Sequence, residues 1–256
     1  MIVAVTVLCA LAAVPVGSFL NVVVDRVPDR APLRGRRDGE PCPPRERWGV
    51  PFQPWLARWG RAPGGGALPA RWLWVELATV ATWAVLAVRY GDSLVVLPLL
   101  VLAAALVAVS VVDLQLLRIP DRITFPALGL SLVAVAVVSA ARGEGGALGA
   151  ALFGMVAYFV LLLLPHLVYP KGMGFGDVKL ALLMGLHLGW LAWAPGDAVA
   201  GPLRVVLVAL VAGCVLGTVF GLAVQVVTRH RGAFPFGPAL ALGCLIVVLW
   251  ADRLRV

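Results

Sequence analysis

The chain has 256 residues, of which 61% are hydrophobic and 13% are charged, and its mean hydropathy is +0.97. A soluble globular domain carries about 25% charged residues, so this composition excludes one and indicates an integral membrane protein. The net charge of +8 reflects orientation in the membrane, as argued below, and does not indicate nucleic-acid binding.

A helix that crosses a bilayer needs about 20 largely apolar residues. The chain divides into about eight such runs, which cover approximately residues 2–24, 72–88, 94–112, 123–141, 147–169, 180–195, 204–228 and 236–251. The first run has no basic residue before it and is longer than the apolar core of a signal peptide, so we interpret it as a retained helix. These runs predict an all-α fold, a polytopic membrane helical bundle of about eight transmembrane helices, as a single domain over residues 1–256.

Lysine and arginine are unevenly distributed between the segments that join the runs. Sixteen of the 21 fall on one side and five on the other. Because positive residues are retained in the cytoplasm, this bias predicts that the first side is cytoplasmic and that both termini face outward.

The longest cytoplasmic segment, residues 25–71, is rich in Arg, Pro and Gly. We expect it to be mostly irregular, with one short interfacial helix near Pro54–Trp59. We expect no disulfide, because Cys9, Cys214 and Cys244 lie in apolar runs and Cys42 is alone in this loop.

Glycines at four-residue spacing occur in two of the predicted helices. They are Gly213, Gly217 and Gly221 in one helix, and Gly185 and Gly189 in another. Small residues at this spacing let membrane helices approach closely, so we assign them to helix packing.

Two aspartates, Asp113 and Asp177, lie at the edges of apolar runs on the predicted cytoplasmic side. Carboxylates at the edge of a membrane span are costly and usually functional. Asp177 follows Gly172, Gly174 and Gly176, which permit positive φ and close backbone approach, so we expect a compact turn there.

The segment after Asp113 contains Ile119-Pro120-Asp121, in which proline is suited to the start of the next helix because it has no backbone donor to lose. Two carboxylates held within a few ångströms lose their protons in separate steps. One can then act as a general base towards water and the other as a general acid, as in aspartic proteases. Either aspartate alone is as readily a helix cap, but two on one face predict a catalytic pair.

Other polar residues fall on the same face. Lys179 is placed to offset the charge of Asp177 or to bind a substrate carbonyl, although the cytoplasmic bias explains it nearly as well. Glu76 and Asn21 are suited to line a substrate groove, to bond the aspartates or to join helices. Asp25, Asp121 and Glu76 are candidates for contacting a positively charged substrate segment.

Several motifs, in their order along the chain, resemble those of the type IV prepilin peptidases, which are membrane aspartyl proteases of bacteria. The segment 17–28 resembles the family's opening signature, and Asp113 with Ile119-Pro-Asp121 resembles its first catalytic motif. Gly174-Phe-Gly-Asp177 and Phe234-Pro-Phe-Gly-Pro238 resemble the second motif and the late loop.

The resemblance implies that Asp113 and Asp177 are the catalytic pair. It also implies a set of residues that shape the substrate site: Gly174, Gly176, Lys179, Pro120, Asp121, Glu76, Pro235 and Gly237. The implied substrate is a prepilin or pseudopilin precursor, cut after a short basic leader at the cytoplasmic face of the bacterial inner membrane.

One departure from the family concerns the loop at residues 25–71. Many members carry two Cys-x-x-Cys pairs there, which hold zinc, and also methylate the new N-terminus. Here the first pair reads Cys42-Pro-Pro-Arg45, and no cysteine stands at the second. One thiolate cannot build a four-coordinate zinc site, so we expect no zinc and no other cofactor. The missing thiols also put the N-methyltransferase activity in doubt.

Two alternative functions are compatible with paired aspartates in a membrane protein. One is an intramembrane aspartyl protease of the signal-peptide-peptidase type, which cuts within the bilayer. The other is an ion- or proton-coupled transporter that uses the aspartates as a relay. The position of both aspartates at the membrane edge disfavours each of them.

Overall fold

The computed structural model describes residues 2–28, 69–170, 172–228 and 234–251. In these residues the regular structure consists of helices, with one isolated β-bridge between Ala194 and Asp197. The helices are α1 (Ile2–Arg26), α3 (Ala70–Tyr90), α4 (Val96–Leu116), α5 (Asp121–Ala141), α6 (Gly145–Val168), α7 (Phe175–Leu191), α8 (Ala200–Thr228) and α9 (Gly237–Trp250). The predicted all-α fold is confirmed.

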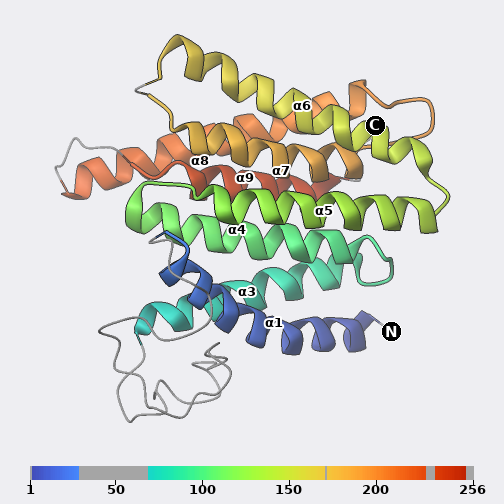
Figure 1. Cartoon of the computed structure of the whole chain (residues 1–256), viewed down its shortest axis with the longest axis horizontal. Coiled ribbons are helices and arrows are strands. Elements are labelled where there is room, and N and C mark those ends of the chain that lie inside the picture. The colour runs from blue at the N-terminus through green and yellow to red at the C-terminus, as the bar shows by residue number, and fades with distance from the viewer. Residues whose placement is uncertain (1, 29–68, 171, 229–233, 252–256) are drawn as a thin grey trace.

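Successive helices run back and forth along one axis, and the start of α1 and the end of α9 lie on the same side of the bundle (Figure 1). The opposite side, at the left of Figure 1, therefore collects the ends of α4 and α6 and the starts of α5 and α7. Asp113 in the last turn of α4 and Asp177 in the first turn of α7 are thus brought to the same side.

Six of the described helices (α1, α3, α4, α5, α6 and α8) are long and apolar enough to cross a membrane, and α9 is a shorter apolar helix. Large apolar side chains such as Val133 and Val137 on α5 and Val211 and Val215 on α8 are exposed on the outside of the bundle. An apolar exterior of this kind is suited to lipid. The protein is a multi-pass membrane protein.

Helix α7 is the buried centre of the bundle, and every residue from Leu186 to Leu191 is buried. Close approach to α6 depends on glycines: a Cβ at Gly154 would lie 2.6 Å from the carbonyl oxygen of Gly185 and 2.7 Å from the Cα of Gly189. The packing role assigned to Gly185 and Gly189 is confirmed.

A second glycine contact joins α8 and α9. A Cβ at Gly213 would lie 3.1 Å from the Cα of Leu240, and one at Gly243 would lie 2.5 Å from the backbone nitrogen of Gly213. Small residues thus let the last two helices pack backbone to backbone, as their spacing predicts.

The sequence placed the helix at α7 too late, at residues 180–195 instead of Phe175–Leu191. Hydropathy misses the polar first turn, because Asp177 and Lys179 lie inside the helix and not on a turn before it.

The predicted interfacial helix at 54–59 lies outside the described residues, as does most of the loop 25–71. At its described ends, Asp25 belongs to α1 and Arg71 belongs to α3.

Candidate active site

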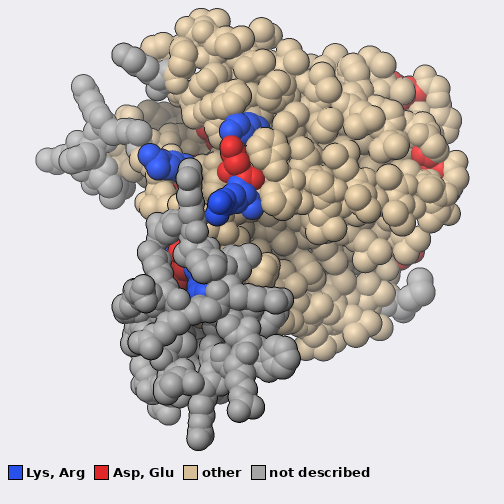
Figure 2. All heavy atoms as spheres, viewed as in Figure 1, with Lys and Arg blue, Asp and Glu red and all other residues tan. Residues whose placement is uncertain are grey.

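A cleft of about 1060 Å³ opens at the end of the bundle where α4 finishes and α7 begins. The two residues directly after α1, the last turn of α4 with the α4–α5 linker, the first turn of α5 and the start of α7 form its walls. Asp113 and Asp177 both line it. In the face shown in Figure 2, Lys and Arg side chains gather with acidic ones towards this end, while most of the remaining surface is uncharged.

Asp113 is held by the backbone of a distant helix. Only 6% of the residue is exposed, and its Oδ2 accepts a hydrogen bond of 2.9 Å from the backbone N–H of Gly237. A Cβ at Gly237 would lie 2.8 Å from that same oxygen. Glycine is therefore needed at the start of α9, because any side chain would displace the carboxylate from its donor.

Asp177 lies in the first turn of α7 and is also 6% exposed. Its backbone N–H donates to the carbonyl of Gly174 at 3.1 Å, which fixes the turn. Its Oδ1 is buried and has no hydrogen-bond partner within the described parts of the chain. The two carboxylates repel each other electrostatically, so the cleft holds a pair of interacting acids.

The glycines around Asp177 act through close approach. A Cβ at Gly176 would lie 2.7 Å from the Cβ of Ile119, and one at Gly174 would lie 3.3 Å from Oδ2 of Asp177. The positive φ that these glycines permit is not used, since the described residues with positive φ are Leu117, Gly143 and Gly196. The reason is that α7 starts here as an ordinary helix, with Gly174 extended at its N-cap.

Lys179 pairs with Asp121 and not with Asp177 in the described contacts. Its ammonium donates to both carboxylate oxygens of Asp121, at 2.8 and 2.7 Å, and lies 5.0 Å from the ring centroid of Phe175. This pair joins the start of α7 to the start of α5 at the edge of the cleft. Pro120 is the N-cap of α5, and its carbonyl accepts the N–H of Ile123 at 3.0 Å, as expected for a proline at a helix start.

Three of the predicted site-shaping residues, Glu76, Pro235 and Gly237, are not among those that line the cleft, although Gly237 contacts the site through its bond to Asp113. Glu76 is completely buried in α3, and a Cβ at Gly17 of α1 would lie 2.9 Å from its Cα. Helices α1 and α3 thus approach closely at Glu76, and the bonding roles expected for its side chain stay predictions. Pro235 lies in the segment before α9, also away from the cleft lining. Asn21 donates to the carbonyl of Trp72 at 3.1 Å and joins α1 to α3.

Sequence reasoning missed Leu117 and Gln115. Leu117 ends α4 with φ 51°, a left-handed conformation that costs a non-glycine residue about 1–2 kcal/mol, and it lines the cleft. Pro120 is a partial signal for this helix end, because the residue before a proline avoids the helical region. No local sequence pattern singles out Gln115, because it accepts a hydrogen bond from Arg71, which lies far away in the sequence on α3.

Within the described ranges, no group of three or more His, Cys, Asp or Glu side chains is arranged to hold a metal ion. His166 lies with Nδ1 3.0 Å from the carbonyl of Met173, and His187 with Nδ1 2.9 Å from that of Leu183. Both histidines therefore have backbone contacts. The loop residue Cys42 lies outside these ranges.

The fold and the cleft define a class of protein: a polytopic membrane protein with two buried, interacting carboxylates at one end of its helical bundle. The sequence model of the type IV leader peptidase family matches residues 100–222, which include both aspartates. A prepilin leader peptidase/N-methyltransferase of Xanthomonas campestris pv. campestris is 30% identical over 93% of this chain and 89% of its own length.

Proteins with the same description from Pseudomonas aeruginosa and Pseudomonas putida are each 31% identical. They match over 97% and 93% of this chain and over 91% and 88% of their own lengths. No solved structure gives a significant match. The chain therefore belongs to the type IV leader peptidase family and is a membrane peptidase, which decides against the transporter alternative.

Proposed function

We propose that this protein is an aspartic endopeptidase that removes the short basic leader from prepilin or pseudopilin precursors, with Asp113 and Asp177 acting together on a water molecule. The observation that carries the proposal is the convergence of the two carboxylates, from α4 and α7, on one cleft. The names of the relatives, which are prepilin leader peptidases, support the substrate class.

The chemistry follows from the arrangement of the pair. One carboxylate takes a proton from water as the water attacks the scissile carbonyl, and the other donates a proton to the leaving amine. The proton belongs to the pair, so the two acids exchange roles over the cycle. The N–H of Gly237 orients Asp113, while the buried Oδ1 of Asp177 has no hydrogen-bond partner among the described residues.

The site is proposed to face the cytoplasm from the bacterial inner membrane. Sixteen of the 21 Lys and Arg residues belong to the segments on the side of the aspartates, and positive residues are retained in the cytoplasm. A precursor with an apolar helix would lie in the bilayer beside the bundle and present its leader junction at the cleft.

We revise which acidic residues are expected to contact the positively charged leader. Of the three acidic candidates, Asp25 pairs with Arg71, Asp121 pairs with Lys179, and Glu76 is buried in α3. Asp121 is the one among them that lines the cleft, and about half of its side chain is exposed. We propose that a leader lysine or arginine exchanges with Lys179 on Asp121.

The test uses Asp113→Asn and Asp177→Asn in membranes with a pilin-like precursor, and follows leader loss on a gel. Asp197→Asn is the matched control, because Asp197 accepts backbone N–H bonds of 2.8 and 2.9 Å before α8 at the other end of the bundle. Each dyad variant is expected to lose cleavage while the control retains it. Full cleavage by either dyad variant would refute the pair.

Mapping the cut site separates this function from cleavage within the bilayer. A cut between the leader and the apolar helix agrees with a cleft at the end of the bundle. A cut inside the apolar helix would indicate the signal-peptide-peptidase type of activity instead.

We propose further that the protein works without zinc. The support is the sequence of the loop, where Cys42 is the one cysteine between residues 25 and 71. Metal analysis of purified protein is expected to find less than one zinc per chain, and a chelator is expected to leave cleavage unchanged. One stoichiometric zinc per chain would contradict this proposal. Mass analysis of the cleaved precursor detects any methyl group transferred to its new N-terminus.

A further inference from the structure

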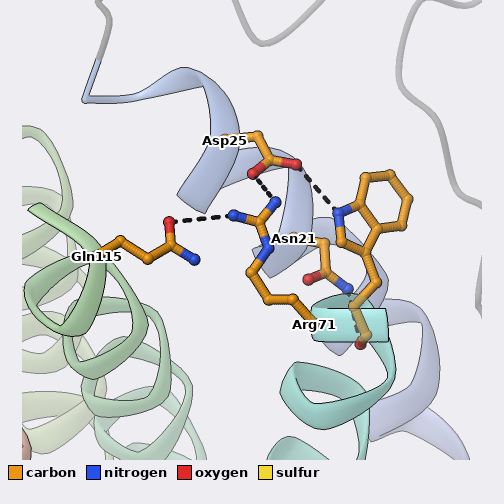
Figure 3. Close-up of polar contacts among 5 residues, drawn as sticks. Asn21, Asp25, Arg71 and Gln115 are labelled. Carbon is orange, nitrogen blue, oxygen red and sulfur yellow. Dashed lines mark hydrogen bonds and ion pairs between the residues drawn. The ribbon is translucent and has the colours of Figure 1, made fainter. Parts of the chain in front are cut away.

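A cluster of polar side chains joins α1, α3 and α4 beside the cleft (Figure 3). Arg71 of α3 forms an ion pair with Asp25 of α1 through one guanidinium nitrogen. Through another, it donates to Oε1 of Gln115 of α4 at 3.1 Å. Trp72 Nε1 donates to the second oxygen of Asp25 at 3.1 Å. One planar guanidinium therefore connects three helices.

Each of the two partners of Arg71 is two residues from a wall of the cleft. Gln115 follows Asp113 by two residues in the last turn of α4, and Asp25 precedes Val27, which lines the cleft at the end of α1. Residues two apart on a helix point to different sides. Asp113 can thus face α7 and α9 while Gln115 faces α3.

The last turn of α4 also carries conformational strain. Leu117 adopts φ 51°, and its N–H donates to the carbonyl of Asp113 at 2.9 Å, so the strained residue closes the turn that holds the aspartate. A strained conformation persists only where the surrounding structure enforces it. The contact between Gln115 and Arg71 is a second constraint on this turn, besides the bond from Gly237 to Asp113.

We infer that Arg71 is a positioning residue for the reaction: by binding Asp25 and Gln115 together, it fixes the end of α4, and with it Asp113, relative to the α1 wall of the cleft. The inference rests on the proposed function. Arginine is suited to the task because its fork makes two directed hydrogen bonds, whereas a lysine ammonium is a point charge on a flexible stem.

Gln115→Leu tests this most sharply, because it removes the contact to α4 and leaves the pair between Arg71 and Asp25 intact. Gln115→Glu keeps the acceptor. Arg142→Met is the matched control, since Arg142 bonds Ser93, which lies before α4, at 3.1 Å at the other end of that helix. Initial rates over a range of precursor concentrations give kcat and KM separately, and thermal unfolding in detergent reports stability.

The expected result is a roughly fivefold lower kcat for Gln115→Leu, with little change in KM or in unfolding temperature. Gln115→Glu and Arg142→Met are expected to match the unmodified protein. A normal kcat for Gln115→Leu, or an equal loss in Gln115→Glu, would overturn the inference. If the unmodified protein cleaves no precursor, the proposed function fails instead.

A second measurement does not depend on cleavage. Spin labels on cysteines introduced at Trp74 of α3 and Leu114 of α4, both exposed, report the distance between the two helices after the native cysteines are replaced. Gln115→Leu is expected to broaden that distance distribution, and Gln115→Glu is expected to leave it narrow. Identical distributions in all three proteins would show that Arg71 does not fix the end of α4.

Discussion

The end of helix α4 at the cleft is held by different chemistry on its two sides. Towards α7 and α9, contacts are made by backbone and glycine: the N–H of Gly237 binds Asp113, and Gly176 lies against Ile119 of the α4–α5 linker. Towards α1 and α3, contacts are made by the long, partly exposed side chains of Arg71 and Gln115. The first side leaves no room for an added atom, whereas the second can adjust through rotamers.

The family match follows this division only in part. It covers residues 100–222, which include both aspartates and the glycines of α7, and it excludes α1 and α3 but also α9 with Gly237. The carboxylate pair thus depends on close backbone packing, while α1 and α3 support it through side chains that can adjust. Substitutions on the glycine side should therefore have large effects, and those at long polar side chains small ones.

The largest effect is expected for Gly237→Ala. The new methyl group would lie 2.8 Å from Oδ2 of Asp113 and would push the carboxylate away from its backbone donor. A displacement of this size costs about 100-fold in rate, to be measured as kcat/KM for a pilin-like precursor. Gly129→Ala, which has nothing within 4 Å of the added atom, is the control. Normal activity of Gly237→Ala would show that glycine is not required at the start of α9.

The second largest effect is expected for Gly154→Ala, which tests the glycine contact between α6 and α7. Its Cβ would lie 2.6 Å from a backbone oxygen of α7, so the helices must separate, at a cost of about 2 kcal/mol. Thermal or detergent-induced unfolding measures the loss. Gly149→Ala on the same helix meets nothing within 4 Å and should be neutral or stabilising. Equal stability of the two variants would contradict the close packing.

A smaller effect is expected at the ion pair of Lys179 and Asp121, which borders the cleft. About half of the Asp121 side chain is exposed, and exposed pairs contribute about 0–1 kcal/mol. Lys179→Met and Asp121→Asn should each change kcat/KM by less than about fivefold, and the double variant should show a non-additive effect. A loss in Lys179→Met as large as in the dyad variants would instead place Lys179 on the catalytic pair.

The smallest effect is expected for Leu117→Gly. Removing the left-handed strain gains about 1–2 kcal/mol, and the greater freedom of unfolded glycine returns about 0.5–1 kcal/mol. We expect a net stabilisation of about 0.5 kcal/mol, visible as a slightly higher unfolding temperature. Because Leu117 lines the cleft, KM is the property to compare in parallel. A clear destabilisation would show that the side chain contributes more by packing than its conformation costs.

The sequence predicted the helices well where apolar residues dominate and poorly where polar ones begin a helix. The run at 94–112 overlaps most of α4, but the start of α7 was missed by five residues because Asp177 and Lys179 lower the local hydropathy. The placement of both aspartates on one side followed from counting spans. The partner of Lys179 did not, since the nearest charge in sequence is Asp177 and the observed partner is Asp121.

By itself, the sequence determined that the chain is a helical membrane protein, and it identified the side to which its charges and paired aspartates belong. Those properties depend on local composition and on the number of crossings, both of which can be read along the chain. Tertiary structure alone decided that Gly237 donates to Asp113, that Glu76 is buried between helices and that Arg71 reaches Gln115. These contacts join residues far apart in the chain, and they exist only because packing sets the distances between helices.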